Sequence, residues 1–156
     1  MWDRIAAAIG GLNLALPKVR LYQDGLPVCG REAEIVRDLA AAGSRNHRIL
    51  TGLIEKGATL MGTEPAALLV QEYELMKQMM AAPGGADRAE VLSYQKRMSA
   101  RVLRERDRHI AHRINTTLGT GETGILFLGM LHSLDGLLDK DIRVTYPLYK
   151  PVSIGG

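Results

Sequence analysis

The feature that most constrains this chain is the stretch from Asp87 to Leu118, which contains neither glycine nor proline. Glycine and proline are the weakest helix formers, so this stretch predicts a single helix that is longer than average and ends at Gly119. The apolar residues of its core-facing stripe recur at helical spacing: Leu103, Ile110, Ile114 and Leu118. The fold therefore has to accommodate one long, arginine-rich helix.

Four short runs of residues have the character of β-strands. Lys18–Tyr22 alternates polar and apolar residues, and Ala58–Met61 is a short apolar run bounded by glycines. Ile125–Leu128 is apolar throughout, as expected of a parallel strand that is buried on both faces. Arg143–Tyr146 is predicted to be the final strand.

Between these strands the apolar residues follow helical spacing. Helices are predicted from Trp2 to Leu16, from Cys29 to Gly43, from Ser44 to Gly57, from Pro65 to Ala82 and from Leu131 to Leu138. Short strands separated by long helical segments predict an α/β fold. We expect a small, mainly parallel sheet of about four strands flanked by helices, with the long helix before the third strand. At 156 residues, the chain suits a single domain covering residues 1–156.

Composition excludes several classes of protein. The longest apolar run, Ile125–Leu131, is too short for a membrane span, and the N-terminus has no signal-peptide pattern. The one cysteine, Cys29, excludes an internal disulfide and fits a reducing compartment, so we expect a cytoplasmic protein with no membrane partner. A net charge of +3 does not demand nucleic acid, and 4% aromatic residues leave few platforms for base stacking. Nucleic-acid binding is therefore the least favoured interpretation.

Polar side chains follow three of the predicted strands. Asp24 comes after the first strand, Glu64 after the second and His132 after the third. In open parallel sheets, ligands bind at the carboxyl ends of the strands. Two carboxylates and an imidazole there can coordinate a divalent metal or act as an acid and base pair. The structural alternative, in which these residues only cap helices and form turns, has about equal weight.

Two charged residues fall on the apolar stripe of the long helix. Arg106 and Asp107 lie three and four residues after Leu103. Because a buried charge is costly unless it is paired, Arg106 is expected to meet Asp24, Glu64, Asp107 or an anionic ligand. The ion pair that Arg106 makes would either fix the helix to the sheet or belong to a functional site. The two interpretations have roughly equal weight.

Two further patterns are set aside. Residues 119–124 match G-x-G-x-x-G, but they follow a helix and precede a strand, the reverse of a dinucleotide-binding fingerprint. The segment is therefore predicted to be a glycine-rich connector. The turn at residues 43–47 is expected at the end of the sheet opposite the site, which leaves His47 out of the candidate residues.

The last third of the chain resembles a known superfamily. Arg106-Asp107-x-x-Ile110-Ala111, followed by an apolar strand and Gly129-x-x-His132, is similar to the second half of the TraB, Tiki and erythromycin-esterase-like superfamily. There, a second G-x-x-H motif, a preceding helix arginine and an acidic residue at another strand end build a site. Some members bind metal and hydrolyse peptide or ester bonds. The resemblance implies His132, Arg106 and Glu64 for these roles.

Two other segments, Tyr22–Gly30 and Gly62–Glu64, resemble parts of an uncharacterised prokaryotic family with no assigned activity. The chain departs from the superfamily because no G-x-x-H-like motif precedes Asp24. Half of the expected metal site is missing, so we expect a truncated or divergent member, a site completed by a partner, or lost catalysis. Loss of a first strand would expose a sheet edge or an apolar groove, which favours a homo-oligomer.

Two functions remain as hypotheses. The leading one is a metal-dependent hydrolase that acts on a small-molecule or peptide substrate of unknown identity. In it, His132 and Glu64 bind zinc or manganese, Asp24 serves as ligand or base, and Arg106 neutralises a developing oxyanion. The alternative is a catalytically degenerate binding or oligomeric assembly module, in which Arg106 makes a structural ion pair.

Overall fold

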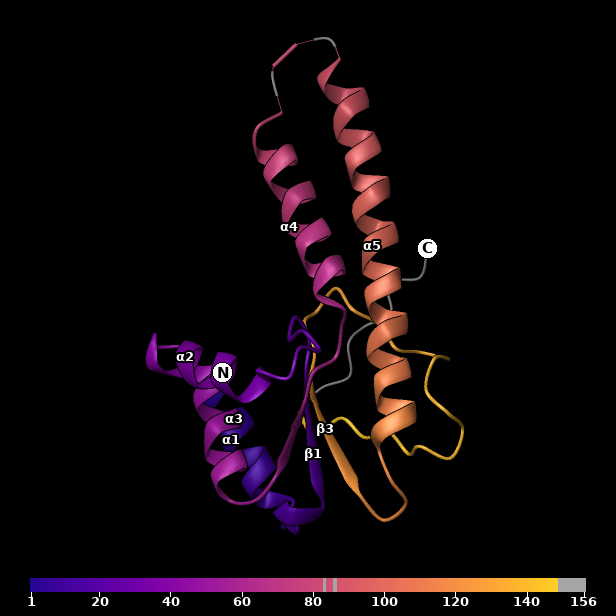
Figure 1. Ribbon diagram of the computed structural model, residues 1–156. Helices are drawn as coiled ribbons and strands as arrows, with labels where there is room; N and C mark the ends of the chain where they lie inside the picture. The colour runs from indigo at the N-terminus through magenta and orange to yellow at the C-terminus, as the bar shows by residue number, and fades with distance from the viewer. Residues whose placement is uncertain (83, 86, 149–156) are drawn as a thin grey trace.

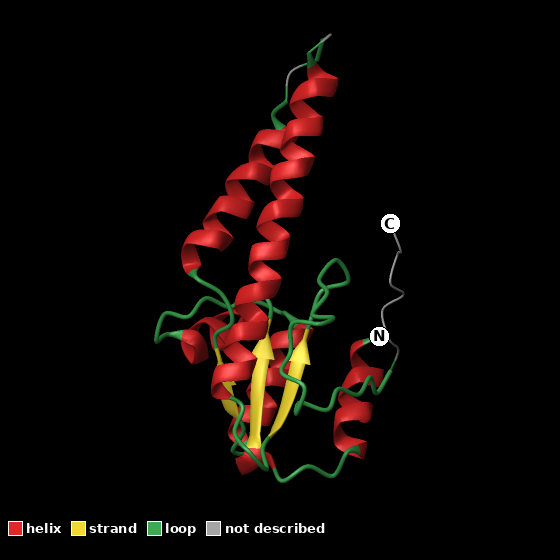
Figure 2. Ribbon diagram, turned by 90° about the vertical axis from the view of Figure 1, so that its right-hand side faces the viewer, coloured by secondary structure: helices red, strands yellow, loops and turns green. Residues whose placement is uncertain are grey.

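Helices cover both faces of a small parallel sheet, and two of them extend well beyond it (Figures 1 and 2). The computed structural model describes residues 1–82, 84–85 and 87–148. The elements in chain order are α1 (Trp2–Gly11), the 3₁₀ helix η1 (Leu16–Lys18), β1 (Val19–Gln23), α2 (Glu32–Ala41), α3 (Arg45–Glu55), β2 (Thr59–Met61), α4 (Ala66–Met80), α5 (Arg88–Thr117) and β3 (Thr123–Phe127). The predicted α/β class and the long helix before the third strand are confirmed.

The sheet has the order β2-β1-β3, with both neighbours of β1 parallel to it. Leu21 at the centre of β1 pairs with Leu60 on one side and Ile125 on the other. The chain passes from β1 to β2 through α2 and α3, and then from β2 to β3 through α4 and α5, which crosses β1 on the opposite face. Such long crossovers are what parallel pairing requires.

Alternating side chains of the strands build two separate cores. On one face, Val19 and Leu21 pack with Val36 of α2 and Leu50 of α3. On the other face, Tyr22 packs with residues of α5 and of the segment after β3, among them Ile110, Ile114, Leu134, Leu138 and Ile142. Successive side chains of β1 point to opposite faces of the sheet, so the strand contributes to both cores. This is expected of a strand that is covered on both sides.

The prediction of a fourth strand at Arg143–Tyr146 is wrong. These residues form no strand, and Val144 and Tyr146 are about half exposed. Leu134, Leu138 and Ile142, which precede them, pack onto the α5 side of the sheet. The chain after β3 therefore crosses a face of the sheet and does not pair along its edge. The alternation of polar and apolar residues in Arg143–Tyr146 does not predict this path.

The predicted helix from Leu131 to Leu138 is also wrong, because this segment forms successive turns. Gly136 adopts a φ of 74°, which interrupts a right-handed helix. The Asn115 side chain of α5 replaces helical hydrogen bonds, since its Nδ2 donates to the Leu137 carbonyl and its Oδ1 accepts from the Asp139 amide, both at 3.0 Å. The helix predicted from Trp2 to Leu16 ends early, at Gly11, before Asn13 with its φ of 47°.

Helices α4 and α5 pack against each other as an antiparallel hairpin that projects from the sheet like an arm (Figures 1 and 2). Leu75 of α4 and Val102 of α5 are buried, and Ser99 lies beside the sulfur of Met79. The lower half of α5 covers the sheet, whereas its upper half contacts α4. Within the described part of the chain, no helix is long and apolar enough to cross a membrane.

The loops that follow β1 and β2 run side by side beyond the sheet, and Gly62 permits their close approach. The Val28 amide donates to the Glu64 carbonyl at 2.9 Å. A Cβ atom on Gly62 would lie 2.6 Å from the Pro27 carbonyl oxygen and 2.9 Å from the Glu32 carboxylate. Only glycine fits there without moving backbone.

We predict that Gly62→Ala lowers the free energy of unfolding by about 1–3 kcal/mol, because an overpacked site forces backbone shifts. The control is Gly52→Ala in α3, where a Cβ would meet no heavy atom within 4 Å. That change should raise the free energy of unfolding by roughly 0.5–1 kcal/mol, because alanine is the better helix former. Urea unfolding measures both. Equal effects of the two substitutions would contradict the close approach at Gly62.

Candidate functional site

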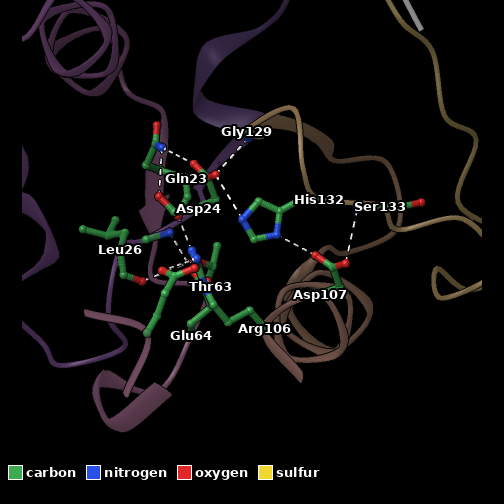
Figure 3. Close-up of polar contacts among 12 residues, drawn as sticks. Gln23, Asp24, Leu26, Thr63, Glu64, Arg106, Asp107, Gly129, His132 and Ser133 are labelled. Carbon is green, nitrogen blue, oxygen red and sulfur yellow. Dashed lines mark hydrogen bonds and ion pairs between the residues drawn. The ribbon is translucent and has the colours of Figure 1, made fainter. Parts of the chain in front are cut away.

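The polar side chains at the carboxyl ends of the strands gather where the chain leaves the sheet in opposite directions. After β1 the chain turns to the side of α2 and α3, whereas after β3 it turns to the side of α5. Adjacent strands whose connections diverge in this way leave a crevice, which is the usual ligand site of open α/β sheets. Asp24 follows β1 and His132 follows β3, so both lie at this point (Figure 3).

His132 lies between two carboxylates. Its Nδ1 is 2.6 Å from Asp107 Oδ1, and its Nε2 is 3.5 Å from Asp24 Oδ2 (Figure 3). The other oxygen of Asp107 accepts from the Ser133 amide at 3.2 Å. The His132 side chain is only 6% exposed. Asp107 therefore fixes both the imidazole ring and the loop that carries it.

Asp24 is held by groups on both sides. Its Oδ1 accepts from Gln23 Nε2 at 2.6 Å, and its Oδ2 accepts from the Gly129 amide at 2.8 Å. A Cβ atom at residue 129 would lie 2.9 Å from Asp24 Oδ2, so the glycine of the G-x-x-H motif makes room for this carboxylate. With its side chain 18% exposed, Asp24 reaches solvent more than His132 does.

Glu64 is fully buried and both of its carboxylate oxygens are engaged. Oε1 accepts from Arg106 Nε at 2.5 Å, and Oε2 accepts from the Gly25 amide at 2.7 Å. Oε2 also lies 2.7 Å from the Thr63 hydroxyl, which donates to the Gln23 carbonyl. These contacts tie the end of β2 to the turn after β1 and to α5.

Arg106 holds two carboxylates at once. Besides Glu64, it binds Glu72 of α4 through Nη1 at 2.6 Å. Burial opposes the positive charge of Arg106, but Glu64 and Glu72 outweigh it and raise the pKa of the guanidinium above its ordinary value. Arg106, which is predicted to need a partner, has two carboxylate partners. The second, Glu72, lies on α4 in the projecting arm.

The structure brings the four predicted site residues together in two pairs. Asp24 lies next to His132, and Glu64 next to Arg106. Glu64 and His132 share no direct contact among the interactions of the described residues, although sequence reasoning had placed one metal between them. The two pairs are joined through α5, because Arg106 and Asp107 are consecutive residues that point to different partners (Figure 3).

Sequence reasoning missed three members of this network. Asp107 was recognised as buried but not as the partner of His132. Gln23, the last residue of β1, directly precedes Asp24 but shows no functional signal in the sequence, whereas its amide binds Asp24. Glu72 had no signal other than lying on a helix before the long one, since its contact with Arg106 depends on how the hairpin closes.

The predicted position of the turn at residues 43–47 is wrong. Asn46 Nδ2 donates to Gln23 Oε1 at 2.6 Å, so this turn lies at the carboxyl end of β1, on the same side as the site. The reason is that α3, and not α2, returns the chain to the start of β2, where Thr59 pairs with Arg20. Asn46 thereby supports Gln23, which in turn supports Asp24. The neighbouring His47 bonds Ser44 instead.

The atoms that could hold a cation are Nε2 of His132 and Oδ2 of Asp24. Two ligands at the usual zinc bond lengths and a tetrahedral angle lie roughly 3.4 Å apart, close to the 3.5 Å observed. Glu64 does not fit this role, because it is fully buried and its charge is already paired with Arg106. The oxygens of Asp24 accept only from neutral amides, and its side chain is 18% exposed. Among the residues that the structure describes, no group of three or more His, Cys, Asp or Glu side chains could hold a metal ion.

Comparison with known proteins gives no relative: no protein-family model, no curated protein and no solved structure matches this chain. The interpretation of the site therefore rests on its own geometry.

The buried pair of Glu64 and Arg106 should contribute far more to stability than the outer pair of Glu72 and Arg106. Glu64→Gln removes one of two oxygens that both accept hydrogen bonds and leaves a buried guanidinium short of a partner. We predict a loss of about 3–5 kcal/mol for this change. Glu72→Gln, at a side chain that is 44% exposed, should cost less than about 1 kcal/mol. Chemical denaturation of both variants tests this, and similar losses would refute it.

Proposed function

We propose that this protein is a hydrolase that works with a divalent cation at the Asp24–His132 pair. The observation that carries the proposal is that each ring nitrogen of His132 faces a carboxylate. When Nδ1 donates its hydrogen to Asp107, Nε2 presents either a second hydrogen or a lone pair toward Asp24. A lone pair that faces a carboxylate oxygen favours a positive charge between them.

The arrangement of the three side chains supports a cation as that charge. Metal-binding histidines commonly donate their other ring N–H to a carboxylate, which sets the tautomer and the ring orientation. Asp107 stands in that position, while Asp24 and Nε2 form the inner pair. A bound zinc or manganese ion would supply Lewis acidity and a more acidic water at this site. Two protein ligands leave room for water and substrate.

The residues of the chain have distinct parts in the proposed reaction. The lone pair of His132 Nε2 would hold the cation, so His132 is not the base. An oxygen of the Asp24 carboxylate is the atom that can take a proton from the attacking water and return it to the leaving group, so that protons balance over the cycle. Asp107 positions the imidazole, and Gln23 positions Asp24. Arg106 is a positioning residue in this proposal, because two carboxylates already hold it. The substrate class is a peptide or ester, as the superfamily resemblance implies.

A non-catalytic binding or assembly module is the second candidate. One observation favours it: each carboxylate oxygen of Asp24, Asp107 and Glu64 has a partner within the protein. A network closed in this way can fix the fold without binding anything else. The two candidates differ in one measurable property, which is cation binding.

We predict that the untagged protein binds zinc or manganese with one-to-one stoichiometry in isothermal titration calorimetry. His132→Ala and Asp24→Asn should each weaken binding at least tenfold, since each removes one of two ligands. His109→Ala is the matched control, because His109 is an exposed histidine of the same helix as Asp107 and should bind normally.

Hydrolysis of a p-nitrophenyl ester, measured with and without the cation, tests the chemistry. We expect cation-dependent turnover that falls by roughly 10²–10⁴-fold in Asp24→Asn, which removes the proton acceptor, and is unchanged in His109→Ala. Circular dichroism of each variant shows whether the fold is kept. If the folded protein binds neither cation and hydrolyses no ester, the hydrolase proposal fails and the assembly module is left.

A further inference from the structure

Helix α4 exposes an apolar surface that nothing in the described part of the chain covers. Four large apolar side chains of this helix are half or more exposed: Val70 at 59%, Tyr73 at 54%, Met76 at 50% and Met80 at 82%. They are spaced three, three and four residues apart, so they share one broad face. We name these four residues the α4 stripe. Scattered apolar residues on a surface are ordinary, but a continuous stripe indicates an interaction site.

The α4 stripe is separate from the seam between α4 and α5. Leu75, the buried residue of α4, faces α5 at the seam, and Met79 contacts Ser99 there. The stripe lies on the flank of the helix, so packing of the hairpin cannot bury it. Figures 1 and 2 show that the arm projects away from the sheet. The exposed fractions of the four side chains show that this flank is open to another molecule.

We propose that the α4 stripe is the contact surface for a second copy of this chain, with the two α4 helices antiparallel across a twofold axis that crosses the stripe at the height of Leu75. This inference does not depend on the proposed hydrolase function. A twofold contact uses the same surface on both copies, so every apolar residue of the stripe is counted twice. A second copy supplies an apolar surface that matches the stripe in length and character, because it carries the same four exposed side chains.

The charges on this face fit an antiparallel second copy. Glu74 and Lys77 form an ion pair at 2.8 Å, and the Lys77 ammonium lies 4.8 Å from the centre of the Tyr73 ring. An axis at Leu75 brings Lys77 of one copy to the level of Tyr73 of the other, within about one helical rise of its Glu74. Opposite charges therefore meet across the axis. In a parallel pair, Lys77 would meet Lys77 and Glu74 would meet Glu74.

The surface area predicts a dimer of moderate affinity. Four side chains that are half or more exposed offer roughly 400–500 Å² per copy, taking about 200 Å² for a large side chain. A standard interface buries about 800 Å² per partner, so the stripe supplies about half and its flanks must supply the rest. Because the stripe alone is smaller than a standard interface, we expect a dimer that dissociates on dilution.

Sedimentation velocity of the full chain over a dilution series tests the surface. We expect a monomer–dimer equilibrium, weakened at least tenfold by the double change Tyr73→Lys with Met80→Lys, which places charge on the stripe. The matched control is Leu39→Lys on α2, another exposed apolar position at 41%, which should dimerise as the unchanged protein does. A monomer at every concentration, or a dimer that ignores the stripe changes, overturns the proposal.

Disulfide trapping tests the orientation. With Cys29→Ser as background, an axis at Leu75 brings Val70 of one copy to the level of Met80 of the other. A mixture of Val70→Cys and Met80→Cys proteins should therefore form mixed disulfides faster than either protein forms its own, as measured by mass after oxidation. Faster self-pairing of Met80→Cys would indicate a parallel pair and overturn the antiparallel arrangement. Recruitment of the stripe to lipid vesicles, without dimers in solution, would overturn the second copy as its occupant.

Discussion

The ion pair between Glu64 and Arg106 is the interaction on which the rest of the structure depends. It joins the end of β2, the turn after β1 and the long helix at one buried point. Each partner alone would be a buried charge, so neither has a stable place until the sheet and α5 have met. The pair thereby selects one height and one rotation of α5 over the sheet. Hydrophobic contacts along the helix are less selective, because they tolerate small shifts.

Because α5 is fixed at Arg106, the next residue is fixed as well. Asp107 points toward the segment after β3 and holds His132, so the position of the imidazole follows from the position of the helix. A helix turns by about 100° per residue, which lets consecutive side chains serve different partners. Arg106 and Asp107, the two charged residues on the apolar stripe, therefore have different roles. Arg106 binds Glu64, and Asp107 holds His132.

Local signals in the sequence predicted most of the elements. Glycine caps and proline junctions placed α2 to α5 within a few residues. Alternation of polar and apolar residues placed β1, and apolar runs placed β2 and β3. The errors lie where distant contacts decide. The segment after β3 has helical spacing of leucines, yet Asn115 and Asp107 satisfy its backbone groups in a non-helical path. Apart from Gly136, residues 129–146 contain no local signal of that path.

The candidate site was also predictable only in part, because its contacts depend on distant parts of the chain. The carboxyl ends of parallel strands share one edge of the sheet, so Asp24, Glu64 and His132 could be expected near one another. Which of them touch could not be read from spacing, because each contact depends on the rotation of α5 about its axis. Helical spacing leaves three acidic partners open for Arg106: Asp24, Glu64 and Asp107. The structure selects Glu64 and adds Glu72, which reaches Arg106 only after the hairpin closes.

Glu72 gives the arm a physical connection to the sheet edge. It lies on the same helix as the α4 stripe and binds the Nη1 atom of Arg106, whose Nε atom binds Glu64. Any molecule that holds α4 in place therefore restrains one of the two carboxylates on Arg106. Arg106 in turn precedes Asp107, the residue that orients His132. Assembly through α4 and chemistry at Asp24 and His132 would thus be coupled through a single side chain, whose two ion pairs differ in burial and hence in strength.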